Sequence, residues 1–196
     1  MKSQAFHFWD KSMSYLDFRT SFETIAHSVI DNPTEKEAEY QGYYELNWRR
    51  STRVEKTYQI SEEALQTVQN LPDKQSWIVI TEGWCGDSSQ LLPVIASLAE
   101  HSNGNIELRI NSRDTYPELL EMYKTNGAMG IPKMIAMDKN GNELWTWGPR
   151  PQYATDLFVE LKGQGLEKTK IYESMHVWYA KDKGKTVEAE IVSLLK

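Results

Sequence analysis

The spacing of apolar residues predicts helices in the first third of the chain. Aromatic and aliphatic side chains recur every three or four residues, which places them on one face of a helix. These side chains are Tyr15, Phe18, Phe22, Ile25 and Val29. Asn32-Pro33 should end this helix, because proline disfavours helical dihedrals in the residue before it.

Two further helices are predicted before residue 72. Thr34, followed three residues later by Glu37, fits a capping box that opens a helix. The apolar stripe expected on that helix consists of Tyr40, Tyr44 and Trp48. Residues 61–71 repeat the helical spacing.

From residue 77 the pattern changes to short β-rich runs that alternate with helical segments. Strands are expected over 77–81, 106–110, 133–137 and 142–146, and helices over 88–100, 116–124 and 152–162. This alternation predicts an α/β fold with parallel pairing. Asp138-Lys139-Asn140-Gly141 predicts a hairpin turn that adds an antiparallel strand. From residue 166 the pattern predicts two more helices, separated by Lys183-Gly184-Lys185.

No clear strand precedes residue 77. The segment 54–60 is the one candidate for an earlier strand, and its signal is weak. We expect three parts: a helical extension over 1–72, an α/β domain over 73–165 and a helical tail over 166–196.

Composition and charge exclude several classes of protein. The 196 residues contain 22 basic and 28 acidic side chains, a net charge of −6, which disfavours a nucleic-acid binder. The start of the chain has no secretory signal, and the most apolar stretch, 91–99, is far below the ~20 residues that cross a bilayer. We therefore expect a soluble, cytoplasmic protein. Its four histidines are scattered and no glycine-rich phosphate loop is present, so we expect neither a metal nor another cofactor.

The single cysteine is the centre of the only specific constellation. Cys85 lies between a predicted buried strand and a predicted helix. The positive end of the helix dipole and the free N–H groups there favour a thiolate, the nucleophilic form. Ser88 lies three residues on, on the same face, where its hydroxyl can donate to the sulfur. Glu82 and Asp87 bring negative charge close by and oppose ionisation.

Residues 77–164 resemble the thioredoxin superfamily. Trp84-Cys85-Gly86 matches the start of its active-site motif, Pro93 the proline within its active-site helix, and Gly130-Ile131-Pro132 its cis-proline loop. Two glycines near the last hairpin also match, Gly141 and Gly148. The resemblance implies a three-layer sandwich, a central mixed sheet flanked by helices. The chain is also similar to a bacterial group of thioredoxin-like proteins with a Trp-Cys-Gly-Asp-Ser stretch.

Three departures from the family pattern bear on function. The second cysteine is Ser88, the proline between the cysteines is Asp87, and the buried carboxylate six residues before the first cysteine is Val79. The resemblance with these departures implies monothiol chemistry. Cys85 would form a mixed disulfide, and an external thiol would release it.

The resemblance also implies the other site residues and the partners. Trp84, Gly86 and Asp87 would line the substrate site, and the backbone of Ile131 beside Pro132 would pair with an extended substrate chain. Partners would be protein or small-molecule thiols and disulfides, including those of glutathione type. No nucleic-acid or membrane partner is expected, and the sequence leaves the oligomeric state open.

Alternative interpretations accompany these residues. Cys85 is otherwise a small buried hydrophobe, and Ser88 an ordinary serine of the first helical turn. The alternative function is a redox-inactive thioredoxin-fold module that binds peptides or proteins. A basic run over 49–53 is best interpreted as a solvated helix end, with an anion site as the alternative.

Overall fold

The computed structural model describes residues 2–196 and contains a five-stranded mixed sheet flanked by helices. The strands lie in the order β1-β3-β2-β4-β5. They are β1 (Met13–Ser14), β2 (Gln75–Thr81), β3 (Ile106–Ser112), β4 (Lys133–Asp138) and β5 (Glu143–Trp147).

The parallel pairing predicted from strand–helix alternation applies only to β2 and β3, where Val79 lies opposite Ile110. β4 runs antiparallel to both β2 and β5, and β1 runs antiparallel to β3. The difference arises after β3. The short helix there, α5 (Pro117–Met122), does not carry the chain back across the sheet, so β4 begins at the end where β3 stops.

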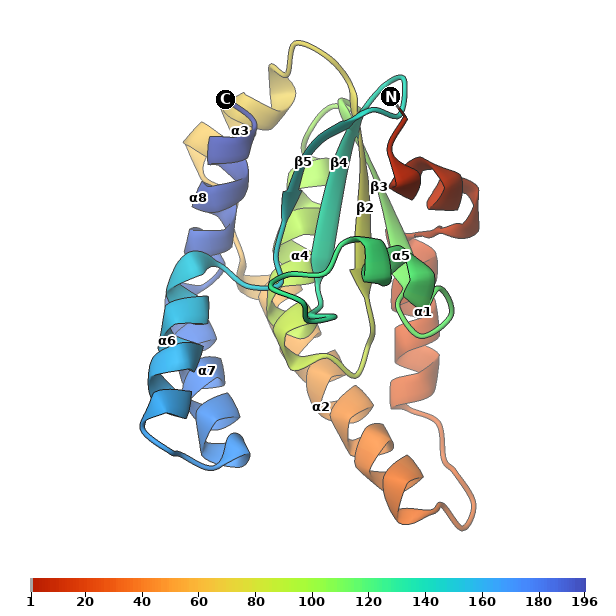
Figure 1. The fold of residues 1–196 in the computed structure, drawn as a ribbon, viewed down its shortest axis with the longest axis vertical. Coiled ribbons are helices and arrows are strands. Elements are labelled where there is room, and N and C mark those ends of the chain that lie inside the picture. The colour runs from red at the N-terminus through yellow and green to blue at the C-terminus, as the bar shows by residue number, and fades with distance from the viewer. Residues whose placement is uncertain (1) are drawn as a thin grey trace.

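The helices cover both faces and both edges of the sheet. They are η1 (Gln4–Lys11), α1 (Tyr15–Ala26), α2 (Glu35–Thr57), α3 (Glu62–Gln69), α4 (Gly86–Glu100), α5, α6 (Gln152–Gly163), α7 (Lys168–Asp182) and α8 (Lys185–Leu194). Figure 1 shows η1 and α1 on the β3 side of the sheet and α6, α7 and α8 on the β5 side, with α4 lying along the sheet.

Two apolar layers enclose the sheet. Successive side chains of a strand point to opposite faces, so Trp77 and Val79 face the layer that contains α4, while Ile78 and Ile80 face η1 and α5. All four side chains are fully buried. This arrangement confirms the predicted three-layer α/β fold of thioredoxin type, with additional helices before and after it.

The first third of the chain forms the predicted helices, but some side chains expected on their buried faces are exposed. The capping box of Thr34 and Glu37 is present and α2 starts directly after Thr34. However, Ile25, Val29 and Tyr40 are exposed rather than inward. Val29 lies beyond the end of α1, and Tyr40 contacts another exposed aromatic, Tyr43.

The expected early strand over 54–60 is wrong, because α2 continues to Thr57. The first strand of the sheet is Met13–Ser14 instead. Two residues at a sheet edge are too few to produce a periodic signal, so the sequence could not identify them.

Candidate active site

Cys85 is the N-cap residue of α4, at the junction with the loop that follows β2. Its Sγ accepts a hydrogen bond from the Ser88 N–H at 3.5 Å and donates one to the Ile131 carbonyl at 3.4 Å. The peptide bond between Ile131 and Pro132 is cis, and β4 begins directly after it. The structure therefore brings Cys85, Ser88 and Ile131-Pro132 together, although they are far apart in the sequence.

The thiol lies in an apolar setting. Cys85 is 8% exposed and packs in the layer that contains Ile80 and Ile131. Burial raises its pKa from 9.0 to about 11, the charge of Asp87 adds to the rise, and hydrogen bonds from Ser88 and from the Asp87 backbone oppose it. The thiol is thus protonated at neutral pH, which suits its donation to the Ile131 carbonyl.

Ser88 is buried in the first turn of α4, next to Cys85. Its side chain is 3% exposed, and within residues 2–196 its hydroxyl oxygen has no hydrogen-bond partner. Val79, in the position of the family's buried carboxylate, is fully buried on the α4 side of the sheet. This position therefore supplies no ionisable group to the site.

Asp87 is the anchor of a buried polar network. One carboxylate oxygen pairs with Arg150 at 2.6 Å, and the other accepts a hydrogen bond from the Tyr179 hydroxyl at 2.9 Å. Arg150 also lies over the Phe158 ring, 4.4 Å from its centroid. The network joins the first turn of α4 to the segment before α6 and to α7. The sequence predicts Asp87 as a charge near the thiol and as a lining residue of the substrate site, but it does not predict these two partners.

Trp84 is half-exposed at the rim of the site. Its indole N–H donates to Asp114 at 3.0 Å, and Arg113 lies over the ring. Its backbone carbonyl accepts a hydrogen bond from the side-chain amide of Asn47 at 2.8 Å. Helix α2 thus holds the loop that carries the cysteine, a contact that the sequence analysis missed.

Gly86 lies under two side chains from different helices. A Cβ atom built on Gly86 would stand 3.0 Å from His176 Nε2 on α7 and 3.8 Å from Arg50 Nη1 on α2. A residue with a side chain would therefore displace His176. Arg50 belongs to the basic run over 49–53, but nothing in the sequence links that run to Cys85, and His176 gives no specific signal. Each approaches the site only after α2 and α7 dock on the domain.

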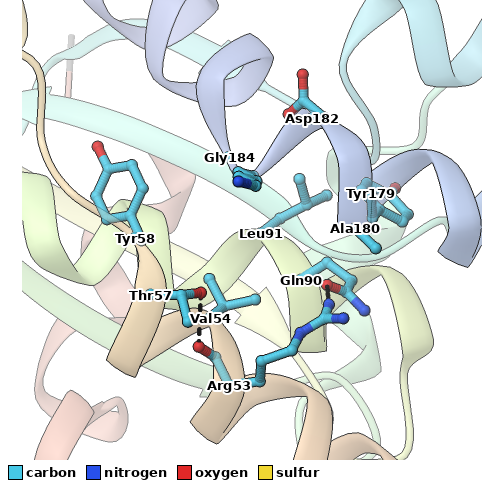
Figure 2. Close-up of a pocket in the computed structure, with 11 residues that line it drawn as sticks. Arg53, Val54, Thr57, Tyr58, Gln90, Leu91, Tyr179, Ala180, Asp182 and Gly184 are labelled. Carbon is cyan, nitrogen blue, oxygen red and sulfur yellow. Dashed lines mark hydrogen bonds between the residues drawn. The ribbon is translucent and has the colours of Figure 1, made fainter.

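A cavity of about 240 Å³ lies next to this region (Figure 2). It is bounded by α2, α4 and the junction of α7 with α8, and its walls include Arg53, Tyr58, Gln90 and Tyr179. Figure 2 shows Arg53 reaching from α2 to Gln90 on α4, a hydrogen bond of 2.9 Å.

Within residues 2–196 no group of three His, Cys, Asp or Glu side chains is arranged to hold a metal ion. In the same part of the chain, none of the helices combines the length and the apolar character that crossing a membrane requires.

Comparisons with known proteins agree with this fold. The chain resembles the solved structure of PA1234, a Pseudomonas aeruginosa protein of unknown function, with a TM-score of 0.64 and 19% identity over 100% of this chain and 98% of that one. It also resembles an HIV epitope-scaffold, with a TM-score of 0.63 and 17% identity over 98% of each chain. At these identities the likeness shows the fold alone. No curated protein matches the sequence. A family model described as Thioredoxin matches residues 34–167, more than half of the chain, so the protein belongs to the thioredoxin family.

Proposed function

We propose that this protein is a monothiol redox protein that forms mixed disulfides through Cys85. The observation that carries the proposal is the position of the thiol. Cys85 Sγ lies at the first turn of α4 and 3.4 Å from the carbonyl of Ile131, in the loop that precedes β4. An extended substrate chain that pairs with this loop would bring its disulfide next to the sulfur.

The reaction has two steps. The Cys85 thiol loses its proton, and the thiolate attacks one sulfur of a disulfide RS–SR. The Cys85–SR bond forms as the S–S bond breaks, and RS⁻ leaves. An external thiol then attacks the mixed disulfide, which restores Cys85 and releases a new disulfide. Ser88 cannot perform this second attack, so turnover depends on that external thiol.

The other site residues have supporting roles in this proposal. The Ser88 N–H already contacts the sulfur and would stabilise the thiolate, and its hydroxyl would serve as a second donor. Arg150 pairs with Asp87 and reduces the negative charge near the reacting atom. Trp84 and Gly86 border the approach to the thiol.

A second candidate function is favoured by the burial of the same thiol. Cys85 is 8% exposed and its pKa is raised to about 11, so the thiolate is a minor species at neutral pH. A module that binds peptides along the Ile131-Pro132 loop without covalent chemistry needs no thiolate. The two functions differ in whether the folded protein accepts a disulfide adduct.

Intact-mass spectrometry after incubation with bis(2-hydroxyethyl) disulfide separates the two candidates. The proposal expects one adduct on the folded protein, more rapidly at pH 9.5 than at pH 7.5, none on Cys85→Ala, and its removal by added thiol. Modification of the urea-unfolded chain but not of the folded chain would support the binding module instead. A Ser88→Cys variant provides the geometric control, since a correctly placed second thiol should form an internal disulfide under mild oxidation.

A further inference from the structure

Two arginines on α2 and a histidine on α7 lie close to Gly86 and Gln90 of α4. We call Arg50, Arg53 and His176 the basic cluster. Arg50 is half-buried, with Nη1 directed at Gly86, the residue after the cysteine. Within residues 2–196 neither Arg50 nor Arg53 forms an ion pair.

The two guanidinium groups are oriented by neutral side chains. Arg50 Nη1 donates to Asn47 Oδ1 at 2.9 Å, and Asn47 in turn holds the Trp84 carbonyl. Arg53 Nη2 donates to Gln90 Oε1 at 2.9 Å. A guanidinium has five N–H donors, and each of these uses one in the described structure. The remaining donors are available to a ligand.

The hydrogen bonds also fix the tautomer of His176. Arginine can only donate, so the Gln90 atom that faces Arg53 is the carbonyl oxygen and the other terminal atom is the NH₂ group. That NH₂ lies 3.4 Å from His176 Nδ1, which must accept. The ring proton therefore lies on Nε2, the atom that packs against Gly86. His176 thus presents a neutral N–H donor beside the Arg50 guanidinium.

The directions of the pKa shifts agree with the absence of an ion pair to either arginine. Burial lowers the pKa of Arg50 to about 10, and the charge of Arg53 adds to this. Burial together with Arg50 and Arg53 lowers the pKa of His176 to about 4. The buried Asp87 carboxylate is already held by Arg150 and Tyr179. Asp182, which lines the same cavity as Arg53, accepts hydrogen bonds from the backbone N–H and the hydroxyl of Thr186. Arg50 is half-buried and Arg53 is exposed. Two neighbouring cations without an ion pair are a setting in which proteins bind carboxylates.

We propose that the basic cluster is a carboxylate subsite, so that the disulfide exchanged at Cys85 belongs to a small molecule that carries a carboxylate group. The inference rests on the proposed function for its covalent step only. Arg50 and His176 come from α2 and α7, and the cavity of about 240 Å³ that Arg53 and Gln90 line adjoins them. That space suits a low-molecular-weight ligand.

The first test compares three disulfides of similar size and different charge. The probes are 3,3′-dithiodipropionate (anionic), bis(2-hydroxyethyl) disulfide (neutral) and cystamine (cationic). Wild-type protein should react fastest with the anion, and Arg50→Gln should lower the anionic-to-neutral rate ratio about tenfold. The preference should also weaken at high salt. Arg50→Lys should retain much of it, and Arg49→Gln, an exposed neighbour on the same helix, should leave it unchanged.

A second test needs no covalent step. Cys85→Ala is titrated with S-methylglutathione, an unreactive thioether with two carboxylates, while the ring protons of His176 are followed by NMR. Binding should shift these signals and raise the pKa of His176, and Arg50→Gln should abolish both effects.

The two tests distinguish failure of this inference from failure of the proposed function. Equal rates for the three probes, or a ratio that Arg50→Gln does not change, would overturn the carboxylate subsite while leaving the mixed-disulfide chemistry intact. If no probe reacts but S-methylglutathione binds through Arg50, the redox function fails and the subsite stands. In the second test, the subsite would also be overturned if Cys85→Ala did not bind S-methylglutathione. It would equally be overturned if a folded Arg50→Gln variant of that protein bound the compound as well as Cys85→Ala does.

Discussion

Removal of the Cys85 thiol should change how the stability of the protein depends on pH. In the folded protein burial raises the pKa of Cys85 from 9.0 to about 11. In the unfolded chain the thiol is solvated and titrates near its ordinary value. Between these two values the unfolded state releases the proton and the folded state keeps it. Stability is therefore full below pH 9 and falls as the pH rises toward 11.

The size of this loss follows from the interval between the two pKa values. About two pH units at about 1.4 kcal/mol per unit give a loss of about 3 kcal/mol. Urea unfolding followed by circular dichroism, at pH values from 7 to 11 with a reductant present, measures it as the difference between wild type and Cys85→Ala. Burial also raises the pKa values of Tyr15 and Tyr58. Both proteins contain these tyrosines, so their contribution cancels.

Two results would refute the reasoning. A wild-type advantage that is constant from pH 7 to 11 would mean that the folded protein does not desolvate the thiol. An advantage that grows as the pH rises from 6 to 9 would mean that the fold lowers the pKa of Cys85, since a stabilised thiolate reverses the sign of the linkage. That second result would favour a reactive thiolate at neutral pH.

Two further substitutions test the surroundings of the site. Arg150→Gln leaves the buried Asp87 carboxylate without its cation and should lower the free energy of unfolding by about 3 kcal/mol, measured by urea unfolding. A loss below about 0.5 kcal/mol would mean that the pair contributes no more than an exposed ion pair. Gly148→Ala should destabilise the protein by at least about 1–3 kcal/mol in the same assay, because Gly148 has φ +106° and a Cβ there would overlap the Pro132 carbonyl. The matched control Gly163→Ala, at an open position of α6, should be neutral or slightly stabilising, and equal losses for the two variants would contradict the steric argument.

The sequence predicts the parts of the fold that depend on local periodicity and on short motifs. β2 contains the continuous apolar run 77–80, and these four residues are fully buried in the centre of the sheet. The helix after Cys85 begins where the dipole argument expects it. The signal fails for β1, whose pairing with β3 depends on two residues at an edge. It also fails for the buried face of α2, which contains polar residues such as Asn47 and Ser51.

The residues of the candidate site also fall into two groups: those that sequence motifs reveal and those that they do not. Cys85 and Ser88 are recognisable because they are adjacent in a motif, and Ile131-Pro132 because it matches a second motif. Their neighbours Tyr179 and His176 are not recognisable. Tyr179 is 92 residues from the Asp87 that it contacts, and no spacing rule links a helix near the end of the chain to the first turn of α4. Such contacts arise from tertiary docking, which leaves no periodic trace in the sequence.

The Asp87 position connects two properties of the molecule that would otherwise be independent. The thioredoxin family has a proline there, and a proline side chain accepts no hydrogen bond. The carboxylate allows Tyr179 and Arg150 to attach α7 and the segment before α6 to the active-site helix. The same charge adds to burial in raising the pKa of Cys85. Asp87 therefore contributes both to the attachment of the C-terminal helices and, in addition to burial, to the suppression of the thiolate. A change that lowers the charge at this position should make the thiol more acidic and at the same time weaken the attachment of those helices.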